Sequence, residues 1–231
     1  MESLKELYRI GPGPSSSHTI APWRAALLFK EKYPEAVSFS VELYGSLSLT
    51  GKGHMTDSIL IKTFSPKPCT IQFRLNWEYK YDNGLILKAY NERSTEIGHW
   101  TVFSLGGGSI KVLEENFEFS RKIYPYQSMH EILEEAKHLH LSLVQIVFQY
   151  EPLIHDYMSD VLSAMLSSVK RGLEASGVMP GKLEIEKIAK SLHLQALASE
   201  DEEETKRLKL ISYAYANSEE NASGHMVVTA P

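Results

Sequence analysis

The chain has 231 residues, of which 43% are hydrophobic and 23% charged, a composition typical of a globular protein with a buried core and unlike that of a disordered or collagen-like chain. The 24 Lys and Arg residues against 29 Asp and Glu residues give a net charge of -5, which argues against a nucleic-acid partner. The single cysteine, Cys69, excludes an internal disulfide and any metal or iron-sulfur site built from several thiolates of this chain. The lone thiol suits a reducing compartment, and the sequence contains neither an apolar run of membrane-spanning length nor a signal peptide, so we expect a cytoplasmic protein without a membrane partner.

Helical and extended patterns alternate over residues 1–113. After a loop rich in Gly, Pro and Ser, the apolar spacing predicts a helix over 19–32. Strict alternation then predicts a strand over 37–43 with one buried face, and a helix is expected over 55–63. Extended runs at 70–79, 85–91 and 100–105 complete a mixed or antiparallel sheet, with Asp82, Asn83 and Gly84 predicting a hairpin turn between the first two runs.

The strand signals stop at Ser128. One helix is expected over 128–150, with Ser128 as its cap and Glu131 as the capping-box partner, followed by helices at 156–175 and 207–216. The fold class is therefore α+β, with an all-helical segment after the sheet. The apolar run at 226–231 has no polar tail or closing element, and we expect the chain to be the first part of a longer protein.

The first polar segment is the loop GPGPSSSHT at residues 11–19. Because it runs into a helix, its backbone N–H groups and hydroxyls favour a carboxylate or phosphate. An ordinary helix cap by Ser17 or Thr19 is the other interpretation, and the loop chemistry leaves both open. His18 adds an imidazole that titrates near neutral pH.

The second polar segment is GSLSLTGKGHMTD at residues 45–57. It places His54 at a helix start as a general acid or base, with Thr56 or Asp57 in reach to orient the ring. Gly53 follows Lys52 where a nucleotide-binding P-loop needs Ser or Thr, so that function is unlikely on spacing grounds. A turn with a surface histidine stays open as the alternative.

Two further segments contain glycines or polar clusters. The three glycines of SLGGGS at 104–109 allow close approach of a ligand or form a hairpin tip. The run NSEENASGH at 217–225 gathers carboxylates, carboxamides and a histidine that are costly to bury unless they bind something polar. A helix end closed by Gly224 explains it equally well. We predict no metal ligands in this chain, since His138 and His140 lack the i, i+4 spacing.

Taken in order, the runs GPGPSSSHT, YGSLSLTGKGHMTD, FSLGGGSI, RGLEASGVMPGKL and YAYANSEENASGHMVVTAP resemble the iron-sulfur L-serine dehydratases, also called L-serine ammonia-lyases. The resemblance spans essentially the whole chain. It implies a β domain at residues 1–113, similar to an allosteric serine-binding domain, and a linker at 114–126. Residues 127–231 would then be the first part of a helical α domain that holds a [4Fe-4S] cluster in the family.

The resemblance also implies a reaction and a set of site residues. In the family, an open iron of the cluster assists the loss of hydroxide from serine, a base removes the α-proton, and the product becomes pyruvate and ammonia. The matching motifs make His54, Lys52 and His18 the candidate catalytic residues. The candidate substrate-binding residues are Ser15, Ser16, Ser17, Thr19, Asn217, Glu219, Glu220 and Asn221.

We therefore expect part of an L-serine dehydratase whose cluster cysteines lie beyond residue 231. On that reading the chain binds no cofactor alone, is inactive alone, needs the missing C-terminal half of the α domain and forms a homodimer. It departs from the family at Leu75, Asn76 and Trp77, where a His-Pro-Asn segment is common. A regulatory module that binds serine or another small carboxylate without catalysis is the main alternative, and a pyridoxal phosphate dehydratase is a weaker one.

Overall fold

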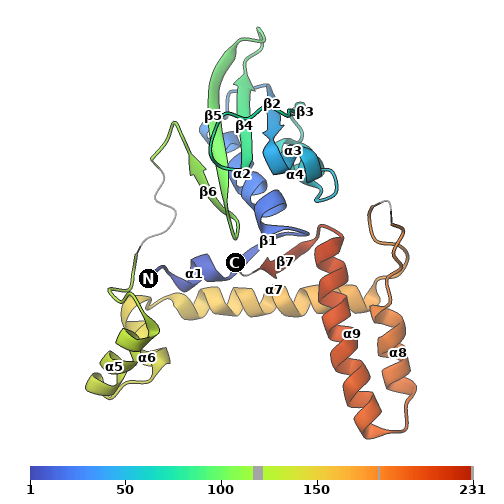
Figure 1. Ribbon diagram of the computed structural model, residues 1–231. Helices are drawn as coiled ribbons and strands as arrows, with labels where there is room; N and C mark the ends of the chain where they lie inside the picture. Colours follow the sequence, from blue (N-terminus) through green and yellow to red (C-terminus); the bar gives the residue numbers. More distant parts are fainter. Residues whose placement is uncertain (117–121, 182, 230–231) are drawn as a thin grey trace.

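The computed structural model describes residues 1–116, 122–181 and 183–229, and its first part is an α+β unit, as predicted (Figure 1). The five-stranded sheet has the order β3-β2-β4-β5-β6. Only β2 and β3 run parallel. The strands are β2 (Ser38–Tyr44), β3 (Cys69–Phe73), β4 (Asn83–Tyr90), β5 (Glu96–Gly106) and β6 (Ser109–Val112).

One face of the sheet packs against helices. In β2 the alternating residues Phe39, Val41 and Leu43 are buried, as the period of a half-buried strand requires. They share one apolar core with Phe29 of α2 (Ala21–Lys32) and with Leu60 of α4 (Thr56–Phe64). A short π-helical turn, η1 (Ser16–Ile20), leads directly into α2, and α3 (Gly45–Thr50) follows β2.

The predicted hairpin between residues 70–79 and 85–91 is wrong. Both strands flank β2, since α4 carries the chain across the sheet and returns β3 parallel to β2. Asn83 and Gly84 are the first residues of β4 instead of a turn. The predicted strand ends at Phe73, and Trp77 then packs so closely on Gly84 that a Cβ there would lie 2.0 Å from the indole.

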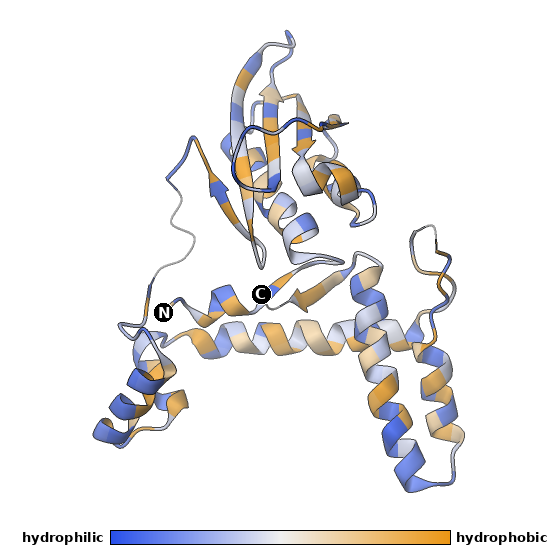
Figure 2. Ribbon diagram, viewed as in Figure 1, coloured by the Kyte–Doolittle hydropathy of each residue, from blue (hydrophilic) through white to orange (hydrophobic). Residues whose placement is uncertain are grey.

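The second part of the chain is a platform of helices around α7 (Ile154–Glu174) (Figure 1). At one end α9 (Glu202–Ala222) packs on α7 and on α8 (Ala189–Ala198). A Cβ at Gly172 would lie 2.3 Å from the Ala216 carbonyl oxygen, so the glycine permits this close crossing. Orange stretches in Figure 2 mark apolar residues along these helices, of which Leu162, Leu166, Leu197 and Leu210 are exposed.

Two helix predictions need correction, and one helix was missed. The single helix expected over 128–150 is two helices, α5 (Met129–Leu139) and α6 (Leu143–Tyr150). His140 takes a left-handed conformation with φ 52°, and Ser142 starts α6 with a capping box. The predicted cap at Ser128 is confirmed, α8 was not predicted, and α9 extends beyond the predicted 207–216 at both ends.

The apolar run near the end of the sequence does have a partner. Residues Met226–Thr229 form β7, which pairs antiparallel with β1 (Arg9–Pro12). The expectation that no closing element exists here is therefore wrong, because the strand partner lies more than 200 residues away in the sequence. Ala230 and Pro231 lie outside the described residues.

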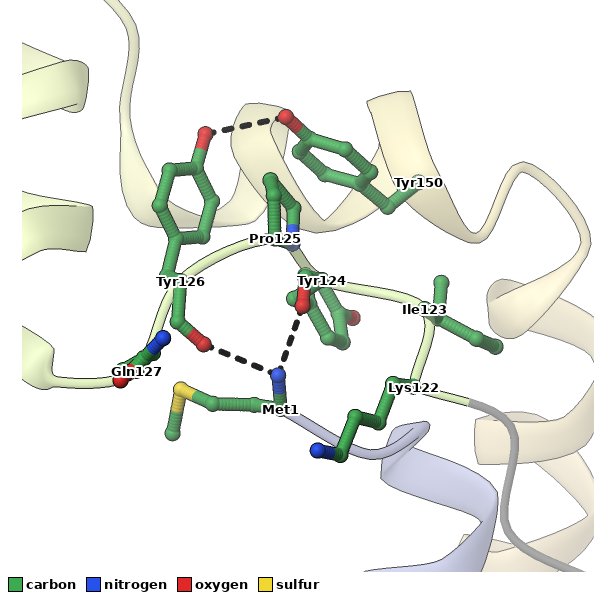
Figure 3. A pocket seen from close by; sticks show the side chains of 8 residues that line it. All are labelled: Met1, Lys122, Ile123, Tyr124, Pro125, Tyr126, Gln127 and Tyr150. Carbon is green, nitrogen blue, oxygen red and sulfur yellow. Dashed lines mark hydrogen bonds between the residues drawn. The ribbon is translucent and has the colours of Figure 1, made fainter.

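The start of the chain, which includes α1 (Leu4–Leu7), contacts the segment predicted as a linker. The amino group of Met1 donates to the carbonyl oxygens of Tyr124 (2.7 Å) and Tyr126 (2.9 Å), beside a hollow of about 690 Å³ (Figure 3). Nearby, the buried carboxylate of Glu151 accepts hydrogen bonds from Ser3, Tyr124 and the Leu4 amide. Within the predicted linker, 117–121 lie outside the described residues.

Within the described residues, none of the helices combines the length and hydropathy that crossing a bilayer would require.

Candidate functional site

The structure brings the two predicted histidines together. His18 lies in η1 and His54 in the turn before α4, and their ring centroids are 4.6 Å apart. Two threonine hydroxyls join the segments reciprocally, because Thr19 donates to the carbonyl of His54 (2.8 Å) and Thr56 donates to the carbonyl of His18 (2.6 Å). The two polar motifs thus form one site.

The serine loop is shaped by its own side chains. Ser15 is the N-cap, and its hydroxyl accepts from the amide of His18 (3.1 Å), so the capping interpretation holds for Ser15 in place of Ser17 or Thr19. The Thr19 hydroxyl accepts from the Ser15 amide (3.3 Å) and is buried. The amides of Ser16 and Ser17 have no acceptor within the described part of the chain, as expected in the first turn of a helix. The groups available to an anion are therefore at Ser16 and Ser17.

The ring of His54 has a defined orientation. Its Nδ1 lies 3.0 Å from the carbonyl oxygen of Thr50. Because a carbonyl only accepts, Nδ1 carries the proton of the neutral ring and Nε2 keeps the lone pair. Thr56 or Asp57 was expected to orient this ring. Instead, the Thr56 hydroxyl donates to the His18 carbonyl, and the Asp57 carboxylate accepts from the Ser58 amide.

His18 lies between two hydroxyls. Its Nδ1 is 3.0 Å from Ser17 Oγ and its Nε2 is 3.0 Å from Ser46 Oγ. Burial lowers the pKa of His18, and the neighbouring His54 lowers it further. His18 is therefore neutral at pH 7, and its ring accepts or donates hydrogen bonds without carrying charge.

The end of α9 closes one side of the loop. Asn221 Nδ2 donates to the carbonyl of Pro14 (3.4 Å), and the amide of Gly13 donates to the carbonyl of His225 (2.9 Å). A Cβ at Gly13 would lie 2.1 Å from the Asn221 carbonyl oxygen. Gly224 has φ 76° and closes α9, as the second interpretation of this segment predicted.

The other polar residues of α9 turn away from the loop. Glu219 caps α8 through the amides of Ile188 (2.6 Å) and Ala189 (3.1 Å), and Asn217 accepts from Ser168 (2.7 Å). Glu220 accepts from Arg171 (2.7 Å) and His225 (2.9 Å). Burial raises the pKa of Glu220, but the hydrogen bonds from Arg171 and His225 outweigh burial and hold it below its usual value.

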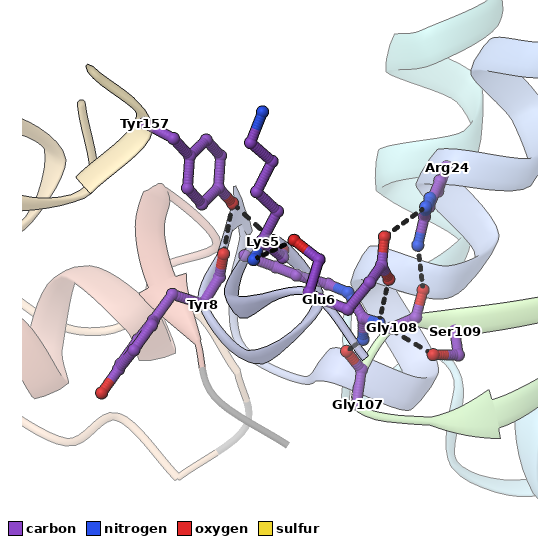
Figure 4. A network of polar contacts seen from close by, with 10 residues as sticks. Lys5, Glu6, Tyr8, Arg24, Gly107, Gly108, Ser109 and Tyr157 are labelled. Carbon is purple, nitrogen blue, oxygen red and sulfur yellow. Dashed lines mark hydrogen bonds and ion pairs between the residues drawn. The ribbon is translucent and has the colours of Figure 1, made fainter. Parts of the chain in front are cut away.

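The structure also places Lys52 and the three-glycine segment, neither of which makes a hydrogen bond to the two histidine rings. The Lys52 ammonium is exposed and lies 5.1 Å from the centre of the Phe73 ring, and it makes no hydrogen bond to the ring of His18 or His54. Gly106, Gly107 and Gly108 form the tip of the β5–β6 hairpin, each with a positive φ. Two of these glycine carbonyls accept hydrogen bonds from arginines. Arg9 donates to the Gly107 carbonyl, and Arg24 donates to the Gly108 carbonyl (3.5 Å; Figure 4).

Sequence reasoning missed Ser46 and Thr50. Both stand in the predicted GSLSLTGKGH segment, yet nothing in their spacing indicates that Ser46 reaches back to His18. The i, i+4 separation of Thr50 and His54 is the one signal that was available, because these residues lie on the same side of a helical turn.

The comparisons with known proteins concern the family to which the chain belongs. The family model "Serine dehydratase beta chain" matches residues 3–69, and "Serine dehydratase alpha chain" matches residues 85–231. Among curated relatives, L-serine dehydratase 1 of Escherichia coli (strain K12) is 31% identical over 100% of this chain and 63% of its own length. L-serine dehydratase of Streptomyces coelicolor is 29% identical over 99% of this chain and 62% of its own. The chain thus spans less than two thirds of the length of these relatives.

Proposed function

Because the chain belongs to the serine dehydratase family, we propose that it is part of an L-serine ammonia-lyase, which converts L-serine to pyruvate and ammonia. The observation that carries the proposal is the close approach of the His18 and His54 rings, tilted by 31° to one another, beside the serine loop. We keep the division into a β domain at 1–113, a linker at 114–126 and the start of an α domain at 127–231 as part of the proposal, with a cytoplasmic location.

The residues of the site divide the work between binding and proton transfer. The amides and hydroxyls of Ser16 and Ser17 hold the substrate carboxylate at the start of the helix. His54 accepts the α-proton at Nε2, because its Nδ1 proton is held by the Thr50 carbonyl. His18 stays neutral and orients the ligand, and Asn221 fixes the loop through Pro14. We keep Lys52 as a candidate catalytic residue of this proposal, although its ammonium lies over the Phe73 ring.

The family's [4Fe-4S] cluster does not fit the residues of this chain. A [4Fe-4S] cluster uses several thiolates, and Cys69 is the single cysteine. Burial raises the pKa of Cys69 to about 12, which disfavours the thiolate form. The described residues also hold no group of three His, Cys, Asp or Glu side chains near enough for a metal ion. We therefore place the cluster of the parent enzyme on residues outside these 231, and the chain alone turns over no serine.

The experiment follows L-serine binding and pyruvate formation by the same 231-residue protein. We expect weak binding, with a dissociation constant of about 1 mM, since only part of the binding surface is present. We expect no pyruvate, even after iron and sulfide are added under reducing conditions. Serine-dependent pyruvate would overturn the proposed inactivity, and complete absence of binding would overturn the site.

The alternative of a regulatory module predicts a different result in this experiment. A stand-alone module would bind L-serine tightly, at about 1 μM, and would reject D-serine. The proposed enzyme fragment instead shows weak binding, because the groups that complete the substrate pocket lie elsewhere. We also propose that the chain forms a homodimer, which the exposed Leu162, Leu166, Leu197 and Leu210 of α7, α8 and α9 support.

A further inference from the structure

A second group of side chains lines a groove of about 470 Å³ where the sheet helices meet the helical platform. Its walls come from α2, α4, α7 and the turn between α9 and β7. The volume falls within the range of about 300–1,000 Å³ that small-molecule sites occupy. The groove borders the serine loop at Pro12 and the turn after α9 at Gly224 and His225, but none of the residues proposed to bind or react with L-serine lines it.

The side chains of two cationic residues and a histidine face this groove. Lys62, Arg171 and His225 all line it. The carboxylate of Glu220, which pairs with Arg171 and His225, is only 1% exposed and does not line the groove. The negative charge therefore lies behind the cations, and the side open to a ligand is positive.

Arg171 and Lys62 both carry N–H donors that make no hydrogen bond within the described residues. Arg171 has five N–H donors. Its Nε donates a hydrogen bond to Glu220 (2.7 Å), and its Nη2 donates one to the Met226 carbonyl (2.7 Å). Within residues 1–116, 122–181 and 183–229, the Arg171 Nη1 donors and its second Nη2 donor make no hydrogen bond. Over the same ranges, the Lys62 ammonium has no hydrogen bond or ion pair. A carboxylate matches these groups chemically, since it accepts several charge-assisted bonds.

The remaining wall is apolar. Trp23 and Leu27 of α2 and Ile59 of α4 line the groove, and Leu27 is 42% exposed. Covering such a surface is favourable for a ligand with an aliphatic or aromatic body. The hydroxymethyl group of serine offers little apolar area to this wall.

We propose that this groove is a second binding site, which takes a small carboxylate with an aliphatic or aromatic body, held by Lys62 and Arg171 against Trp23, Leu27 and Ile59. The charge complementarity and the apolar wall select this class of ligand, and the site is separate from the one proposed for L-serine.

The test compares isovalerate with isoamyl alcohol, which has the same branched body without the carboxylate. Titration is followed by calorimetry and by the fluorescence of Trp23, with Trp23→Phe assigning the optical signal. We expect saturable binding of isovalerate and none of the alcohol. Lys62→Gln should weaken isovalerate binding about tenfold through loss of a charge-assisted bond. Lys206→Gln removes the same charge from an exposed position on α9 and should change nothing.

Several results would overturn the second site: equal binding of both probes, no binding of isovalerate, or an unchanged affinity in Lys62→Gln. Competition between isovalerate and L-serine would also overturn it, because no residue proposed to contact L-serine lines the groove. The proposed function can fail independently. If L-serine does not bind while isovalerate binds in a Lys62-dependent way, the histidine site is wrong and the groove stands.

Discussion

Replacing Gly13 with alanine should separate the serine loop from the end of α9. The added Cβ would lie 2.1 Å from the Asn221 carbonyl oxygen and 2.5 Å from its Oδ1, whereas ordinary contact begins at 3.4 Å. The loop or the helix end must therefore move by more than 1 Å, and the bond from the Gly13 amide to His225 is strained with it. Overpacking of this kind costs about 1–3 kcal/mol.

Urea denaturation and L-serine titration measure the two consequences. With a slope of about 2 kcal/mol per molar urea, the midpoint should fall by about 0.5–1.5 M. L-serine binding should weaken at least tenfold, because displacements near 1 Å are costly at a preorganised site. Gly53→Ala is the matched control, since its Cβ would meet nothing nearer than 3.4 Å. The close-approach argument fails if Gly13→Ala matches Gly53→Ala in both measurements.

Two other predictions concern the platform. Burial raises the pKa of Glu151, but bonds from Ser3, Tyr124 and Leu4 hold it below its usual value. Its ionised form therefore stabilises the fold above the unfolded pKa of about 4.3, and this contribution is lost as the pH falls through the lower folded pKa. Glu151→Gln should cost about 1–3 kcal/mol at pH 7 and less below pH 3, as measured by urea midpoints, and a pH-independent loss would contradict this. Light scattering should show concentration-dependent dimers that weaken in Leu166→Lys, and a monomer at all concentrations would contradict the homodimer.

Local signals in the sequence identify those helices and strands that are stabilised mainly by residues nearby in the sequence. Alternation located β2, and the cap at Ser128 located the start of α5. The break at His140 was missed because the capping box of Ser142 competes with a continuous apolar pattern. The strand pairings β2 with β3 and β1 with β7 depend on partners far away in the sequence, and no local pattern reveals them.

The same distinction applies to the site. His18 and His54 stand in recognisable motifs, but the approach of their rings depends on two threonine hydrogen bonds between segments 35 residues apart or more. Glu219 and Glu220 stand in an equally recognisable motif, yet the start of α8 and Arg171 engage their carboxylates. A motif indicates which polar groups a segment offers, whereas long-range partners decide which of these groups remain available to a ligand.

The central claim is that L-serine binds at the paired histidines His18 and His54, and imidazole NMR of the ¹⁵N-histidine-labelled chain tests it most directly. Addition of L-serine should shift the ring nitrogens of His18 and His54, and titration should place the pKa of free His18 below its usual 6.5. His193 should not respond, because it lies on α8 against Ser212. Saturable shifts confined to His18 and His54 are the predicted result. Unchanged resonances of both at saturating L-serine would contradict the account.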